Sequence, residues 1–351
     1  SQGRCPRAQR PHDGPHGHEH RHRHRCQATP IARQPVRRAL IDSTQALEVN
    51  EFPSSAVIIG AGAIALEFAS MWNAAGSKVT LLIRKDRVLS AWDRRAGTTL
   101  TRELKRHGVN IITRASVTHV DTGANLGATV HYTREGQDGE QSVWGEIALV
   151  AIGRDPITDP AWGVTIDDHG HVATDAYGRT DKPGVWAVGD VTAGHALAHR
   201  AFEQGIVIAE TIAGLNPKPV DEATVPQIVF SFPEAASVGL TVEQAQARED
   251  LIEIKETNYP MLANARMLMS GTAGSLTIVS GCDAANPDTP RVLGVHMVSQ
   301  MASDIIAEAE QLVGNHVPLA DAARSFHPHP TFSETLGEAL LKADGRPLHT
   351  R

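Results

Sequence analysis

Apolar and polar positions alternate along most of the chain with the two periods that distinguish strands from helices. Residues 56–60 and 78–83 are short apolar runs, which predict two buried strands. Between them, residues 63–75 are apolar at helical spacing, and Gly76 follows where a helix would end. This order predicts a strand–helix–strand unit near the start of an α/β domain.

The same periods predict further elements downstream. Alternating strands are expected over 110–144, with turns at 121–123 and 136–139, and further strands at 227–230, 275–279 and 291–298. Helices are expected at 94–107, 196–212, 242–248, 302–313 and 333–341. The proline-rich stretch 216–219 is a plausible linker. We therefore divide the chain into four regions: 1–38, 41–149, 150–219 and 225–345.

The first region differs from the rest of the chain. Residues 1–38 are rich in Arg, His, Pro, Gly and Gln and show almost no apolar periodicity, which predicts disorder. Six histidines lie between residues 12 and 24. We expect an out-of-frame translation of a GC-rich reading frame here, with the true frame resuming near Arg37 or Ile41. Two alternatives stay open: a His-rich metal tether and, because of the interleaved arginines, a nucleic-acid-binding arm.

Composition narrows the class of protein. The 351 residues are 41% hydrophobic and 21% charged, as in globular proteins, and the net charge of −7 argues against nucleic-acid or anionic-membrane partners. No apolar run approaches the roughly 20 residues that a membrane span needs. The three cysteines, Cys5, Cys26 and Cys282, show no paired spacing, so a reducing cytoplasm is the expected location.

A glycine-rich turn follows the first predicted strand. Gly60, Gly62 and Ala65 fit the pattern GxGxx(G/A) between a strand and a helix, the context in which it indicates dinucleotide binding. The first glycine makes the tight turn, the second lets the backbone approach a pyrophosphate, and the small third residue lets helix and strand pack closely. The alternative is a tight turn that binds no ligand.

The end of the second predicted strand bears on which coenzyme would bind. Arg84, Lys85 and Arg87 place three cations in four positions, where an NAD site usually has a carboxylate for the ribose 2′-hydroxyl. Cations there suit the 2′-phosphate of NADP, although a solvated basic turn is also common. NADP is therefore slightly favoured over NAD.

From Ile41 onward the sequence resembles the flavin-dependent pyridine nucleotide–disulfide oxidoreductases. Four motifs carry the resemblance, in family order: residues 60–70, 151–156, 185–190 with 197–205, and 327–334. It implies an α/β fold with a Rossmann-like NAD(P) domain, part of an FAD domain, and an α+β dimerisation domain. The implied cofactors are FAD and NAD or NADP, and the implied partners are a second copy of the chain and a small or protein-bound disulfide or dithiol.

The resemblance also implies roles for individual residues. His329 matches the family's base and Glu334 its partner, acting across the dimer interface on the disulfide of the other subunit. That role fits the chemistry, because a carboxylate orients an imidazole and stabilises its protonated form. The cofactor positions that match are Gly153, Asp190 for the ribityl chain, Leu197, Ala198 and His199 along the flavin, and Glu67, whose counterpart pairs with a lysine near the flavin. Asp190 is expected just after a strand at 185–188 and Gly189, where a carboxylate can accept hydrogen bonds from ligand hydroxyls.

The substrate is left open. The tail from residue 327 looks most like dihydrolipoamide dehydrogenases, whereas Ala65 and Arg84 look more like NADPH-dependent glutathione or mycothione reductases. The sequence also lacks the family's other glycine fingerprint before residue 60 and any Cys-x4-Cys pair. We therefore expect a truncated or frame-disrupted oxidoreductase, with a non-catalytic module that pairs with full-length relatives as the alternative. No metal ligands are assigned.

Overall fold

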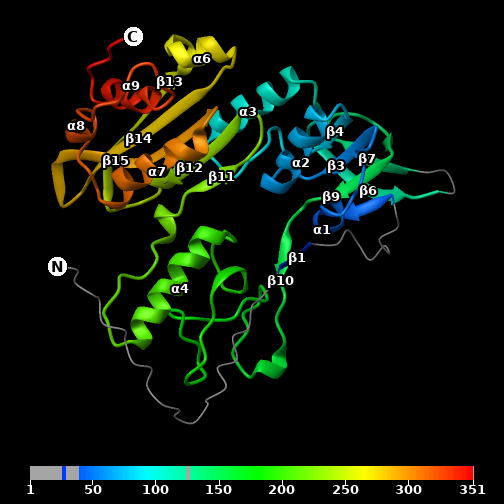
Figure 1. Ribbon diagram of the computed structural model, residues 1–351, viewed down its shortest axis with the longest axis horizontal. Helices are drawn as coiled ribbons and strands as arrows, with labels where there is room; N and C mark the ends of the chain where they lie inside the picture. The colour runs from blue at the N-terminus through cyan, green and yellow to red at the C-terminus, as the bar shows by residue number, and fades with distance from the viewer. Residues whose placement is uncertain (1–25, 29–38, 124–126, 351) are drawn as a thin grey trace, which may run out of the picture.

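The computed structural model describes residues 26–28, 39–123 and 127–350. The histidine-rich tract, with the three hypotheses about it, lies outside these residues. The described chain forms three groups of elements (Figure 1): a domain built on a parallel sheet at the right, a region around one long helix below, and an antiparallel sheet with its helices at the upper left. We call the second group the central region, because it lies between the other two along the sequence.

A parallel sheet forms the centre of the first group. It has five strands in the order β2 (Leu40–Asp42), β9 (Ile147–Val150), β3 (Ser55–Ile59), β4 (Lys78–Leu82) and β5 (Asn110–Ile112). The short helix α1 (Ser43–Ala46) follows β2. Alternate residues of β3 enter different cores, because successive side chains point to opposite faces of a strand. Ile58 packs with the helix side of the sheet, and Val57 and Ile59 pack with the other side.

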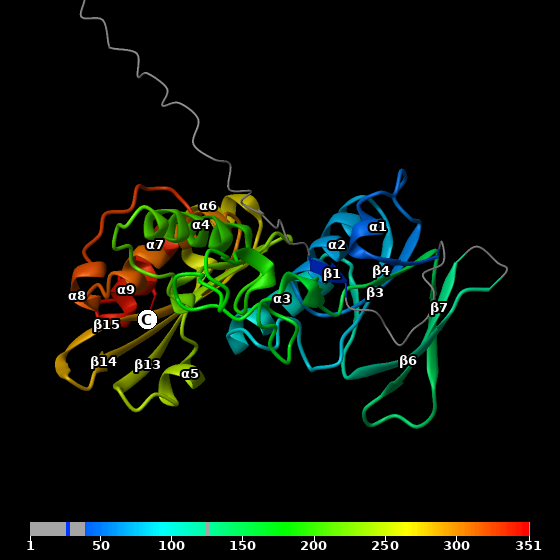
Figure 2. The ribbon, with the colours of Figure 1, turned by 90° about the horizontal axis from the view of Figure 1, so that it is seen from below.

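Two helices and a small sheet cover the faces of this parallel sheet. Helices α2 (Ala63–Ala74) and α3 (Arg94–Arg106) pack on one face. The other face carries a three-stranded antiparallel sheet of β6 (Ala115–Asp121), β7 (Ala128–Arg134) and β8 (Gln141–Gly145). In Figure 2, β6 and β7 lie at the outer side of this domain, away from α7, α8 and α9.

The central region has little regular structure besides α4 (Ala198–Ile212). It also contains β10 (Arg154–Pro156) and the 3₁₀ turns η1 (Pro160–Trp162), η2 (Gly189–Val191) and η3 (Glu222–Thr224). Its own buried core is small, with Val172, Ala187 and Val191 at its centre. The linker expected at 216–219 leads from α4 towards η3.

Two details of this region differ from the sequence-based expectation. The sequence predicts Asp190 just after a strand, but Asp190 lies in η2, and residues 185–188 make only an isolated bridge, between Trp186 and Arg179. The reason is that their backbone hydrogen bonds close a tight turn with residues 178–182 instead of extending a ladder. In the range expected to be disordered, β1 (Cys26–Ala28) pairs with β10. Such pairing needs only backbone groups and no apolar periodicity.

The third group is a five-stranded antiparallel sheet covered by helices. Its order is β11 (Gln227–Val229), β12 (Glu234–Gly239), β15 (Asn286–Ser299), β14 (Ser275–Asp283) and β13 (Leu251–Pro260). Helices α7 (Ala302–Gly314), α8 (Leu319–Ala322) and α9 (Glu334–Ala343) pack on it in one core. The smaller elements are α5 (Val242–Gln246), η4 (Met261–Ala263) and α6 (Ala265–Ser270).

The first and third groups share a core. Val229, Ala235 and Val298 of the antiparallel sheet join the cluster formed by α2, α3 and the parallel sheet. Arg95 of α3 also pairs with Glu256 of β13 at 2.8 Å. Among the described residues, no helix is both long and apolar enough to cross a membrane.

Candidate functional site

The glycine turn is held between three strands of the parallel sheet. Gly60 follows β3, and its N–H donates to the Leu82 carbonyl of β4 at 3.1 Å. Its φ of +143° favours glycine, and a Cβ at this position would overlap the carbonyl oxygen of Ala151. The same Cβ would lie 3.3 Å from the Cβ of Ala65, which is fully buried. The turn therefore requires glycine at 60 and a small residue at 65.

Gly62 lies directly before the first residue of the helix that follows. It is the N-cap of α2, and no side chain caps the helix there. A Cβ at Gly62 would meet no atom within 4 Å, so the space before the helix N-terminus is open. Uncapped N–H groups and the helix dipole favour an anion at this end. The residues present thus fit the pyrophosphate of a nicotinamide dinucleotide.

The basic residues lie at the carboxyl end of the neighbouring strand. Arg84 and Lys85 are exposed just after β4, and neither makes an ion pair with any residue that the structure describes. Asp86, the only nearby acid in the sequence, is 3.1 Å from Arg87 and 3.9 Å from Arg94. No carboxylate at this strand end is therefore left unpaired for a ribose.

A pocket of about 370 Å³ opens beside the glycine turn. It is lined by residues 61–63 of the turn, 89–92, 195–197 from the loop before α4, and Gln227 and Ile228 of β11. Gly62 and Leu197, predicted to bind different cofactors, therefore face one cavity. Arg84, Lys85, Asp190 and His199 do not line it.

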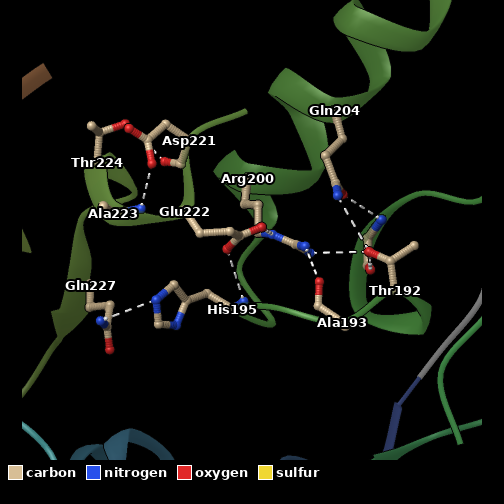
Figure 3. Close-up of polar contacts among 11 residues, drawn as sticks. Thr192, Ala193, His195, Arg200, Gln204, Asp221, Glu222, Ala223, Thr224 and Gln227 are labelled. Atoms are coloured by element: carbon tan, nitrogen blue, oxygen red, sulfur yellow. Dashed lines mark hydrogen bonds and ion pairs between the residues drawn. The ribbon is translucent and has the colours of Figure 1, made fainter. Parts of the chain in front are cut away.

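A polar network fixes the loop that forms the far wall of this pocket (Figure 3). The buried guanidinium of Arg200 pairs with Glu222 at 2.5 Å and donates to Ala193 O and, at 3.2 Å, to Thr192 Oγ1. Glu222 in turn accepts from the His195 N–H at 3.3 Å. Buried cations need paired acids, so this arrangement holds the loop in one conformation.

Sequence reasoning missed the members of this network. His195 Nε2 lies 3.5 Å from the Gln227 amide, so both walls of the pocket contact each other. Arg200 lies inside the motif at 197–205, but no pattern in the sequence pairs it with Glu222. One turn further along the same face of this helix, Gln204 accepts from the N–H of Gly189 at 2.9 Å and so positions η2, which carries Asp190.

Two other predicted cofactor residues contact the start of the antiparallel sheet. Glu67 of α2 accepts from the Phe230 N–H at 3.0 Å. His199, the second residue of α4, is exposed, and its Nε2 lies 2.8 Å from the Pro226 carbonyl. Ala198 and Gly153 are both exposed, and Gly153 has a φ of +145°. Glu67 and His199 therefore reach β11 from its two ends.

The predicted base and its partner are in contact. His329 Nδ1 lies 2.8 Å from Glu334 Oε1, and the other carboxylate oxygen accepts from the Thr331 N–H at 2.8 Å. The carboxylate is thus fixed at the first residue of α9, while the His329 side chain is 75% exposed. An Nδ1–H that donates to a carboxylate leaves Nε2 available to accept a proton from outside.

His327 has a different environment. Its side chain is 8% exposed, with Nε2 3.0 Å from Glu308 of α7. The hydrogen bond to Glu308 raises the pKa of His327. The ring also fills the space beside Gly337 of α9, where a Cβ would overlap it. His327 therefore ties its loop to two helices and does not face solvent as His329 does.

Two groups of predicted site residues are thus brought together, and the others lie around them. The glycine turn and Leu197 share the pocket, whereas His329 and Glu334 lie at the start of α9, on the other side of the molecule from α2 in Figures 1 and 2. A glycine turn at the carboxyl edge of a parallel sheet is the arrangement of Rossmann-type domains. Here such a domain is joined to an antiparallel sheet group that carries an exposed His–Glu pair.

Comparisons with known proteins identify the family. Residues 27–205 match the pyridine nucleotide-disulphide oxidoreductase model, and residues 225–340 match the dimerisation domain of the same group. The chain therefore belongs to the pyridine nucleotide-disulphide oxidoreductase family, which confirms the predicted resemblance and fold class. The four-region division stays a prediction.

Individual relatives agree with this assignment. The chain is 37% identical over 88% of its length to a dihydrolipoyl dehydrogenase of Cupriavidus necator, and 35% identical over 89% to one of Bacillus subtilis. It spans 64% and 65% of these two proteins. Among solved structures, LpdA of Mycobacterium tuberculosis is similar at 27% identity and a TM-score of 0.78, covering 90% of this chain and 68% of that one. The flavoprotein disulfide reductase RclA of Escherichia coli has the same TM-score, with 26% identity and coverage of 90% and 71%.

Proposed function

We propose that this chain supplies the coenzyme-binding and proton-transfer parts of an NAD(P)-dependent flavoprotein disulfide oxidoreductase of the dihydrolipoamide dehydrogenase type. The observation that carries the proposal is the pocket of about 370 Å³ shared by the glycine turn and the loop before α4. A nicotinamide coenzyme seated on the turn would enter this space. In such enzymes, hydride passes between the nicotinamide, the flavin and a disulfide.

The coenzyme's phosphates would rest on the uncapped N-terminus of α2. Gly60 keeps the turn tight against Ala151, and Gly62 leaves room for the pyrophosphate. The wall formed by His195, Leu197 and Gln227 would hold the other end of the ligand. These residues bind and orient the coenzyme and exclude water from it.

The flavin site fits only in part among the described residues. Asp190 in η2 and the N-terminus of α4, which has no side-chain cap, suit the ribityl chain and the polar edge of a flavin. A second glycine turn for the adenine half of FAD is not among the residues that the structure describes. The proposed roles of this chain's residues therefore involve no step at the flavin. Phe202 and Ile206 of α4, 72% and 50% exposed, would provide an apolar surface for the complementary part of such a domain.

NADPH is the coenzyme that this site favours. Arg84 and Lys85 are exposed cations beside the turn, with no unpaired acid near them. A ribose 2′-phosphate would gain charge-assisted hydrogen bonds there. Calorimetric titration of the full chain with NADPH and NADH tests this proposal.

A pair of charge substitutions supplies the matched control for that titration. Arg84→Gln should weaken NADPH binding about tenfold and leave NADH binding unchanged. Lys78→Gln removes the same charge at the amino end of the same strand, where it should change neither affinity. Equal effects of both substitutions would refute the coenzyme preference. No heat with either coenzyme on a folded sample would refute the site itself.

His329 would take a proton from a dithiol, with Glu334 orienting the ring and stabilising its charged form. Because the ring is exposed rather than directed into this chain's pocket, the dithiol would come from another subunit across a dimer interface. We therefore propose a homodimer, or a mixed dimer with a full-length relative, held by the region that matches the family's dimerisation domain.

A complementation experiment tests this role. The chain is mixed with a full-length dihydrolipoyl dehydrogenase whose own catalytic histidine has been replaced, and dihydrolipoamide oxidation is measured. Activity should return with the wild-type chain and disappear with His329→Gln. His349→Gln serves as the control, because His349 makes the same 2.8 Å contact, with Glu338 of the same helix. Mixed dimers without recovered activity would refute the proton-transfer role.

A further inference from the structure

A pair of stacked histidines lies on the small sheet of the coenzyme domain, outside the pocket. His119 of β6 is the direct partner of His131 of β7, and their rings stack at 4.2 Å between centroids with planes 8° apart. Each edge of the stack faces one carboxylate. Both Nδ1 atoms face Glu140, at 3.8 and 3.6 Å, and both Nε2 atoms face Asp121, at 3.7 and 3.2 Å.

We propose that His119, His131 and Glu140 form a binding site for a divalent transition metal such as Zn²⁺. One ligating atom from each of the three residues lies within 4.8 Å of the others. Ligands of a tetrahedral zinc ion bonded at about 2.0–2.1 Å lie about 3.3 Å apart. The observed distances from Nδ1 to the carboxylate exceed this by about 0.5 Å or less. Because the rings are stacked 4.2 Å apart, side-chain rotation must also tilt their Nδ1 edges towards each other so that both nitrogens point at one ion.

The surrounding groups suit this role. Asp121 faces the ring nitrogens opposite the proposed metal, the usual place for a carboxylate that fixes the orientation of a metal-bound histidine. Thr118 Oγ1 donates to Glu140 at 2.6 Å and so fixes the third ligand. Two neutral imidazoles and two carboxylates would balance the charge of a divalent cation.

The local backbone explains why the cluster forms. The register between β6 and β7 shifts between Val117 and His119, and such an irregularity redirects side chains. Thr118 and His119 can therefore both reach Glu140, which immediately precedes β8. The side chains of His119, His131 and Glu140 are 42%, 23% and 44% exposed, so water can supply the fourth ligand. A bound ion would link the three strands of this sheet.

The site is separate from the coenzyme pocket. None of its residues lines that pocket. In Figure 2, β6 and β7 lie at the outer side of the domain. The metal site therefore neither requires nor excludes the proposed enzymatic function, and coenzyme affinity can report on folding in its test.

The experiment is a calorimetric titration of the full chain with ZnCl₂. Because the six histidines at 12, 16, 18, 20, 22 and 24 could also bind zinc, all are first replaced by serine in the full-length background. We expect one zinc per chain. Binding should disappear in His131→Gln and in Glu140→Gln, and weaken about tenfold in Asp121→Asn.

A histidine beside a single carboxylate provides the control. His171 Nδ1 lies 3.6 Å from Asp167, but among the described residues these two do not belong to a group of three converging ligands, so His171→Gln should bind zinc like the background protein. Far-UV circular dichroism and coenzyme titration check that each variant is folded. Absence of zinc binding by the folded background protein, or unchanged zinc affinity in His131→Gln, would overturn the proposal.

Discussion

Two glycines in one turn should respond to the same substitution in opposite ways. Gly60→Ala places a Cβ less than 3.0 Å from the carbonyl oxygen of Ala151, a distance that real Cβ atoms essentially never show, and it does so at a φ of +143°. Gly62→Ala places a Cβ in open space, at an ordinary φ of −91°. The first change should therefore act on folding and the second on coenzyme binding.

The magnitudes follow from these geometries. A non-glycine residue in a disfavoured backbone region costs about 1–3 kcal/mol, and overpacking adds about 1–3 kcal/mol. Gly60→Ala should therefore lower the unfolding free energy by about 2–6 kcal/mol. Gly62→Ala should cost about 1 kcal/mol or less as a change of N-cap residue. Its methyl group would displace the pyrophosphate, and losing hydrogen bonds to a charged group, worth about 1.5–3 kcal/mol, weakens binding about 10- to 100-fold.

Urea denaturation followed by far-UV circular dichroism gives the unfolding free energies, and calorimetry with NADPH gives the affinities. Gly76→Ala is a useful third variant, because Gly76 also has a positive φ, of +96°, but meets no atom within 4 Å of its Cβ. It should lose about 1–2 kcal/mol of stability through strain alone and bind NADPH normally. If Gly62→Ala retained the wild-type affinity, the pyrophosphate would not lie on this turn.

Three further results are expected. Because the pKa of His327 is raised in the folded protein, its pair with Glu308 stabilises the fold fully below the ordinary pKa of 6.5, and this stability is lost as the pH rises through the folded-state pKa. Denaturation of Glu308→Gln at several pH values should show an unfolding free energy lower by about 1–2 kcal/mol at low pH and little changed at high pH. Glu67→Ala should lower the unfolding free energy by about 1 kcal/mol because it removes the acceptor for the Phe230 N–H, whereas Glu67→Gln keeps an acceptor and should lower it clearly less. Equal losses of unfolding free energy in urea denaturation would count against this hydrogen bond. Cys282, fully buried, should react with a thiol reagent only at the rate of unfolding, measured by mass spectrometry.

Much of the fold could be predicted because local signals and the tertiary structure agree. The sequence predicts a helix at 94–107, and α3 spans Arg94–Arg106. Its start is fixed locally, because Asp93 caps the N-terminus by accepting from the Ala96 N–H at 2.8 Å. Strand β13 was missed although it has ten residues. Its pairing is irregular between Ile252 and Lys255, and Glu253 has a positive φ, so the alternation that marks a strand is broken. Residues 185–188 show the opposite error: a strand was predicted there and none forms, because an apolar run needs a neighbouring strand to form a ladder.

Whether a candidate site could be predicted from the sequence depends on how far apart its residues lie along the chain. The glycine turn spans six positions, and His329 and Glu334 are five apart, so one loop or helix start brings each set together and sequence patterns could identify both. The pocket wall could not be found in this way. It depends on Arg200 meeting Glu222, which follows from the fold of the central region and from no local pattern. The His119 and His131 stack likewise depends on strand register.

The pocket also depends on how the third group of elements is held against the first two. Gln227 and Ile228 of β11 form part of its wall. The backbone on either side of these residues is bonded to His199 of α4, through Pro226, and to Glu67 of α2, through Phe230. Because α2 begins at the glycine turn and α4 at the opposite wall, one segment of β11 fixes the distance between the walls. A change in the antiparallel sheet that moved β11 would therefore alter coenzyme binding without touching the glycine turn.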